Sequence, residues 1–221
     1  MQRYGWNERE SKNTMSETQS KETKTIQLLQ SALDGSLDYR GYRAEMAVQA
    51  ERGETSGPVQ SEALVGYTFL NHRRMRRWEK TYRLSEAVAD RLQQTRAKHT
   101  WLVLTESWCG DAAPILPVLN AFAEASADLD LRIADRDRNP ELMERYPTDG
   151  ALAIPKLLVL DGEATRVLGH WGPRPSEPME MVRAYKKAHG RLSADFRESL
   201  QRWYNRDKGR AITAELLGLL A

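Results

Sequence analysis

The spacing of apolar residues changes at Thr100. Before it, residues that suit a packed face recur every three or four positions, which is the period of an α-helix. This spacing predicts a helix from Ser61, which can act as its N-cap, to about Tyr82, and a second helix that starts at Ser85. After the change, the run 101–104 is short and continuously apolar, which is typical of a strand buried on both faces.

Beyond that run, predicted strands and helices alternate. We predict a helix after Cys109-Gly110-Asp111, a strand over 129–133, a helix from Asn139, a strand over 154–160, a returning strand over 165–168 and a helix over 178–189. Such alternation is typical of an α/β fold with a mixed, mostly parallel sheet and helices on both faces, which makes a three-layer sandwich. The Asp161-Gly162 pair favours a tight hairpin, which adds one antiparallel strand.

The chain divides into four parts by composition. Its first residues are rich in Ser, Thr, Glu and Lys and carry too little apolar surface to fold alone. We therefore expect a disordered tail over 1–24 and a helical N-terminal extension over 25–97, which starts with a short helix over 26–33. The α/β domain then covers 98–190, and C-terminal helices over 191–221 are expected to pack on the same unit.

Composition narrows the class of protein further. The formal net charge is +2 over 221 residues, so the total charge gives no reason to expect a nucleic acid or a membrane as partner. No run approaches the roughly 18 apolar residues of a membrane span, and no apolar signal segment follows Met1. Cys109 is the single cysteine, which excludes an intramolecular disulfide. These features favour a cytoplasmic protein.

Three features in order along the chain resemble the thioredoxin superfamily. Trp108-Cys109-Gly110 follows the first predicted strand, Pro117 lies inside the next helix, and Ile154-Pro155 precedes an apolar strand. The resemblance covers roughly 98–190 and implies a thioredoxin-like fold with a cis peptide bond before Pro155. It also implies a peptide or substrate groove beside Cys109, formed with Ile154, Pro155, Trp171 and Arg174.

The motif is similar to that of a poorly characterised bacterial branch of this superfamily, which carries Trp-Cys-Gly-Asp. The strings 105–113, 154–156 and 171–175 resemble that branch, and so does the helical N-terminal extension. Its members provide no defined biochemical activity to transfer to this chain.

Three departures from the thioredoxin pattern limit the chemistry. Ala112 stands where thioredoxins have the resolving cysteine, Asp111 replaces the intervening proline, and Val103 replaces the buried acidic residue. A two-cysteine reductase needs a second thiol to release its mixed disulfide. Thioredoxin-type dithiol reduction is therefore excluded for the isolated chain.

Two hypotheses remain for Cys109. At the start of a helix its thiol pKa would fall, which makes it a candidate nucleophile in a monothiol redox protein. Its partner would then be a protein or small-molecule thiol or disulfide, such as glutathione. Asp111 opposes thiolate formation by its charge, and Arg174 could offset that effect. The alternative is an inert thiol in a redox-inactive binding or scaffold module. A weaker third option is a protein whose helical extension forms the interface with a partner.

No other motif indicates chemistry. The basic run 72–77 is more typical of a solvated helix face than of a nucleic-acid site. The histidines have no metal-ligand partners at familiar spacing: His72, His99, His170 and His189. We therefore expect no metal and no cofactor, and the sequence leaves the oligomeric state open.

Overall fold

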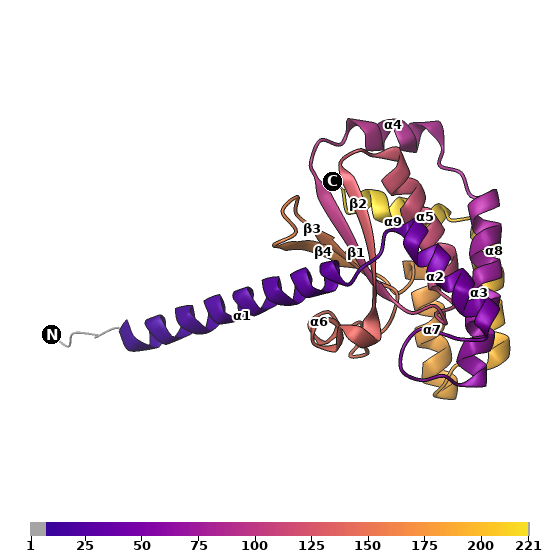
Figure 1. Ribbon diagram of the computed structural model, residues 1–221, viewed down its shortest axis with the longest axis horizontal. Coiled ribbons are helices and arrows are strands. Elements are labelled where there is room, and N and C mark those ends of the chain that lie inside the picture. The colour runs from indigo at the N-terminus through magenta and orange to yellow at the C-terminus, as the bar shows by residue number, and fades with distance from the viewer. Residues whose placement is uncertain (1–7, 221) are drawn as a thin grey trace.

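The computed structural model describes residues 8–220. In chain order (Figure 1) its elements are α1 (Glu8–Asp34), α2 (Tyr39–Arg52), α3 (Glu62–Thr81), α4 (Glu86–Gln94), β1 (His99–Thr105), α5 (Ala112–Ala125), β2 (Leu129–Asp135), the 3₁₀ turn η1 (Arg136–Arg138), α6 (Pro140–Glu144), β3 (Lys156–Leu160), β4 (Val167–Trp171), α7 (Ser176–His189), α8 (Ala194–Asp207) and α9 (Arg210–Gly218).

The described strands form one sheet in the order β2-β1-β3-β4. β1 pairs in parallel with β2 and antiparallel with β3, and β3 pairs antiparallel with β4. The sheet is mixed, and the expected mostly parallel arrangement does not hold. Between β2 and β3 the only α-helix is α6, whose five residues span about 7.5 Å at 1.5 Å per residue. A helix of that length cannot carry the chain back along a seven-residue strand. The chain therefore enters β3 at the same edge of the sheet at which it leaves β2.

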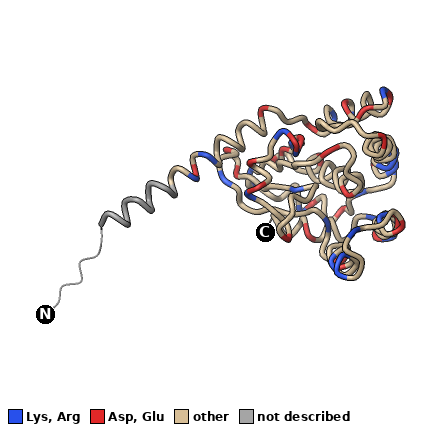
Figure 2. The backbone as a smooth tube through the Cα atoms, turned by 90° about the horizontal axis from the view of Figure 1, so that it is seen from below, with Lys and Arg blue, Asp and Glu red and all other residues tan. Residues whose placement is uncertain are grey.

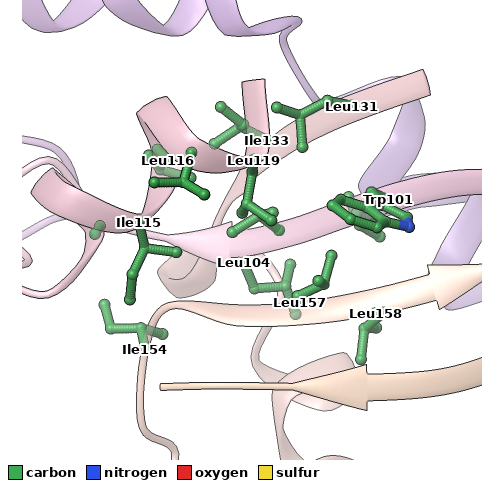
Figure 3. Packing of buried hydrophobic residues seen from close by; sticks show 14 of the residues in the cluster. Trp101, Leu104, Ile115, Leu116, Leu119, Leu131, Ile133, Ile154, Leu157 and Leu158 are labelled. Carbon is green, nitrogen blue, oxygen red and sulfur yellow. The ribbon is translucent and has the colours of Figure 1, made fainter. Parts of the chain in front are cut away.

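Helices cover both faces of the sheet. Every residue of β1 from Trp101 to Thr105 is buried, and successive side chains of a strand point to opposite faces. On one face Trp101 stacks on Phe122 of α5 with ring centroids 5.8 Å apart. Figure 3 shows Leu116 of α5 close to Ile133 of β2, within the same apolar core.

The helix α1 is longer than the sequence predicts. It begins at Glu8 rather than near Ile26, and in Figure 1 it projects away from the body of the molecule. Its sequence contains no Gly or Pro and many good helix formers, but it lacks the apolar period on which the prediction relied. The expected tail over 1–24 is thus helical from Glu8 onward, and residues 1–7 lie outside the described residues. Among the side chains of α1 that the structure describes, Leu29 and Ala32 are the ones buried in the core.

The C-terminal helices pack on the same body as the sheet. Tyr204 of α8 and Ile212 and Leu216 of α9 have no exposed surface, and all three join the main core cluster. Trp203 donates a hydrogen bond through Nε1 to Glu177 of α7, over 2.7 Å. These contacts place α8 beside the loop that carries the sequence motif.

Candidate functional site

The loop Trp108–Asp111 connects β1 to α5 and meets the segment before β3. The peptide bond Ile154–Pro155 is cis, and the Cys109 Sγ donates a hydrogen bond to the carbonyl oxygen of Ile154, over 3.4 Å. The structure therefore brings together the two sequence segments that carried the resemblance.

Cys109 is buried, with 6% of its surface exposed. Burial raises the pKa of its thiol to about 12, and the negative charge of Asp111 acts in the same direction. The backbone N–H groups of Ala112 and Asp111 and the charge of Arg174 lower the pKa, but by less. Burial thus outweighs the effect of the helix start, and the thiol is protonated.

Asp111 is held by two partners from distant parts of the chain. Its Oδ2 lies 2.5 Å from Nη2 of Arg174, and both side chains are largely buried. The Tyr204 hydroxyl donates a hydrogen bond to Oδ1 over 3.1 Å. Burial lowers the pKa of Arg174, and the Asp111 carboxylate more than reverses this, so the guanidinium stays charged. The carboxylate forms no cap hydrogen bond on α5 and instead contacts Arg174 and Tyr204.

The helix α8 lies over the motif loop. Besides the hydroxyl of Tyr204, the side-chain amide of Gln201 donates from Nε2 to the carbonyl oxygen of Gly110, over 2.8 Å. Sequence reasoning predicted a helix in this region but assigned it no part in the site. The available signal was the pair of polar residues Gln201 and Tyr204 next to the apolar Leu200 and Trp203.

Two polar residues before the motif join the loop to the N-terminal helices. Ser107 accepts from the backbone N–H of Ser56 over 3.0 Å, and its carbonyl oxygen accepts from Nδ2 of Asn71 in α3 over 3.1 Å. Glu106 has no exposed surface and accepts from the Ser56 hydroxyl and from the backbone N–H of Asp137. Burial raises the pKa of Glu106, and those two hydrogen bonds oppose the rise. The sequence analysis missed both residues.

A groove of about 770 Å³ opens beside Cys109. Its walls come from α3, the motif loop, residues 152–154 and the α7–α8 region. Trp108 lies at the groove, with the guanidinium of Arg136 over its ring at 5.1 Å. A volume of this size is far larger than a small ion needs and lies in the range of ligand-binding pockets.

A family model described as thioredoxin matches residues 57–187 of the chain. The protein belongs to the thioredoxin family. The match begins inside the expected N-terminal extension, so α3 and α4 fall within the part that the family model covers. This agrees with the hydrogen bonds that join α3 to the motif loop.

Two solved structures resemble this thioredoxin-family protein. One is a protein of unknown function from Pseudomonas aeruginosa, with a TM-score of 0.57, 20% identity, and coverage of 86% of this chain and 94% of that chain. The other is an HIV epitope-scaffold, with a TM-score of 0.55, 20% identity, and coverage of 86% and 95%. At this identity they support the fold alone. No curated protein matches the chain.

The other residues expected at the motif and the thioredoxin-like groove lie in three places. Ile154 and Arg174 line the groove, while Pro155 and Ala112 are buried behind it. Trp171 lies outside it, because its Nε1 donates to Glu215 of α9 over 2.7 Å. The assignment of Trp171 to the peptide groove stays a prediction, and its partly buried ring packs against the apolar core.

A second cis peptide bond, Gly172–Pro173, borders the first. Gly172 has φ of 103°, and a Cβ at this position would collide with the carbonyl oxygen of Pro155. Only glycine fits there without strain. The sequence analysis did not predict this second cis bond.

The basic run on α3 contributes one residue to the groove. Arg74 lines it, whereas Arg77 donates to Asn205 of α8 and Arg73 lies over the ring of Phe69. Among the residues that the structure describes, no group of three acidic, His or Cys side chains is placed to hold a metal ion. None of the described helices is long and apolar enough to cross a membrane.

Proposed function

We propose that this thioredoxin-family protein is a binding module that docks a segment of a partner protein in the groove beside Cys109. The burial of Cys109 is the observation that carries this proposal. A thiol with a pKa of about 12 does not attack disulfides at neutral pH, because the thiolate is the nucleophile. The groove next to it remains open to a ligand.

Cys109 has a structural role in this proposal. Its thiol donates to Ile154, which links the motif loop to the segment before β3. The neighbouring Asp111–Arg174 pair joins the same loop to the connection after β4. The groove is thus built on a rigid base, which favours binding because little order has to be created when a ligand docks.

A monothiol redox protein acting through Cys109 is the second candidate. Hydrogen bonds from the backbone N–H groups of Asp111 and Ala112, which stabilise a thiolate, favour it. In that reaction the Cys109 thiolate attacks the glutathione sulfur of a mixed disulfide, and the substrate leaves as its thiolate. The thiolate of a second glutathione then attacks the glutathione sulfur bound to Cys109, which forms glutathione disulfide and releases the Cys109 thiolate. Cys109 lines the groove with 6% of its surface exposed, so a disulfide would have to enter the groove to meet the thiol.

A rate measurement separates the two candidates. The substrate is a mixed disulfide of glutathione with a model peptide, and free glutathione is the reductant. We expect the wild-type protein and Cys109→Ala to leave the rate at its uncatalysed value. Catalysis by the wild type that Cys109→Ala removes would reject the binding-module proposal in favour of the redox one.

The binding half of the proposal has its own matched control. Leu152 lines the groove and is 42% exposed, while Leu168 on β4 is 47% exposed and lies outside the groove. Proteins retained by the immobilised wild type should also be retained by Cys109→Ala and by Leu168→Glu, but not by Leu152→Glu. Equal loss with both glutamate variants would argue against the groove as the docking site.

A further inference from the structure

We infer that the groove takes an acidic, extended peptide segment and that Arg74 is the residue that receives one of its carboxylates. This inference rests on the proposed binding function and specifies the chemistry of the partner.

The charges that line the groove are mostly positive. Its basic residues are Arg74, Arg136, Arg174, Lys186 and Arg197, and its acidic residues are Asp111 and Glu198.

Both acidic residues of the groove already have partners. Asp111 pairs with Arg174, and Glu198 pairs with Arg202 outside the groove. Arg136 pairs with Asp137. Among the described side chains, Arg74, Lys186 and Arg197 are left without an ion pair. A groove of this kind attracts carboxylates and repels basic segments.

Arg74 is the best placed of the three cations. It is half-buried, and its only hydrogen bond among the described residues goes from Nη1 to Oδ1 of Asn71, over 3.0 Å. A guanidinium has five N–H donors, so most of them remain available. Burial lowers the pKa of Arg74, but an arginine remains charged at neutral pH. A partly desolvated guanidinium binds a carboxylate more strongly than an exposed one does.

The position of Arg74 is fixed from two sides. Asn71, its hydrogen-bond partner, donates to the carbonyl oxygen of Ser107 beside the motif. A Cβ on Gly110 would lie 3.9 Å from Nη1 of Arg74 and 3.7 Å from Nε2 of Gln201. The guanidinium therefore sits above the motif loop, between α3 and α8. A carboxylate bound there would lie next to the motif loop.

The apolar part of the lining indicates a peptide. Leu70 and Leu152 both line the groove and are 40% and 42% exposed. A small anion would leave them in water, whereas acidic residues that alternate with apolar ones would satisfy both kinds of lining. Along the described backbone in Figure 2, Lys and Arg positions alternate with Asp and Glu positions. The formal net charge of +2 gives no general attraction to a nucleic-acid backbone.

Fluorescence anisotropy with three labelled hexapeptides and the full chain tests the inference. The peptides alternate leucine with glutamate, glutamine or lysine. We expect the glutamate peptide to bind most tightly, and we expect its affinity to fall as salt is added. Arg74→Gln should weaken its binding about tenfold, as expected for the loss of a charge-assisted hydrogen bond. Arg76→Gln is the matched control, because Arg76 lies on the same helix but outside the groove, and should leave binding unchanged.

The outcomes separate this inference from the proposal beneath it. Equal binding of the glutamate and glutamine peptides, or equal loss with Arg74→Gln and Arg76→Gln, would overturn the acidic specificity but leave the binding module standing. Failure of all three peptides to bind would reject both. If a single-stranded oligonucleotide displaces the glutamate peptide and binds more tightly, the inference of a peptide is wrong. Should Arg74→Gln not fold, Arg197→Gln, which changes an exposed groove cation, must weaken binding for the inference to hold.

Discussion

At Asp111 one carboxylate contacts Arg174 and Tyr204, while its charge acts on the thiol of Cys109. In a two-cysteine thioredoxin this turn carries proline and leads to a second thiol; here it leads to Ala112. The guanidinium of Arg174, which was expected to stabilise a Cys109 thiolate, forms an ion pair with Asp111. At the scale of single residues, the site thus favours a fixed loop over an ionised cysteine.

Replacing the carboxylate should change both stability and thiol chemistry. Asp111→Asn is expected to lower the free energy of unfolding by about 3 kcal/mol, because Arg174 would stay buried without its counter-charge. The pKa of Cys109 should fall as well, but burial, the largest cause of its rise, remains. Urea denaturation and alkylation against pH measure the two effects. Asp149→Asn removes a carboxylate from an exposed pair with Arg183 and should leave both nearly unchanged.

The sequence predicted the neighbours of Cys109 better than its chemistry. The motif and Ile154-Pro155 meet as the resemblance implied. The protonation of Cys109 depends on how much of the chain buries it, and no local pattern around residue 109 records that. Glu106 and Ser107 escaped notice for the same reason: their partner Ser56 comes from another part of the chain.

The helices α8 and α9 show the same limit for whole elements. Their helical character follows from local sequence, and both lie within the range 191–221 for which C-terminal helices were predicted. Their contacts with the motif loop join residues that lie far apart in the chain, such as Gln201 and Gly110. The direction of β3 could not be predicted from local sequence either. An alternation of strands and helices does not show whether a connection such as α6 is long enough to bring the chain back along the sheet.

Because α9 is part of the core, its apolar face should contribute strongly to stability. Leu216 has no exposed surface, and Leu216→Ala is expected to lower the free energy of unfolding by about 3 kcal/mol through lost burial and the cavity left behind. The matched change Leu168→Ala, on a half-exposed side chain of β4, should cost less than about 0.5 kcal/mol. Similar losses for the two variants would show that α9 is not a structural part of this domain.

Over the whole molecule, the parts combine into one thioredoxin-family body with a covered thiol. Ser56 and Asn71 hold the motif loop from the N-terminal side, and α8 covers it from the C-terminal side. The sequence resemblance covered 98–190 and located the central sheet and the motif loop. The helices that pack on this loop, α3 and α8, lie outside that range. With these helices in place, Cys109 lies at the base of a groove and is buried.

The covered thiol also links stability to pH. The folded state holds the proton of Cys109 more tightly than the unfolded chain, whose thiol has a pKa of about 8.5. The stabilisation is complete below that pH and is lost as pH rises toward about 12. A single cysteine makes the group easy to follow, because no other thiol contributes to the signal.

The most direct test is therefore a pH titration of the Cys109 thiolate in the folded protein, by ultraviolet absorbance and by the rate of alkylation, with Cys109→Ala as the blank. A thiol that remains protonated to pH 10 and reacts slowly, in keeping with a pKa of about 12, is the predicted result. A pKa at or below about 8.5 with rapid alkylation would contradict the account, because Cys109 would then be an accessible nucleophile rather than a buried part of a binding groove.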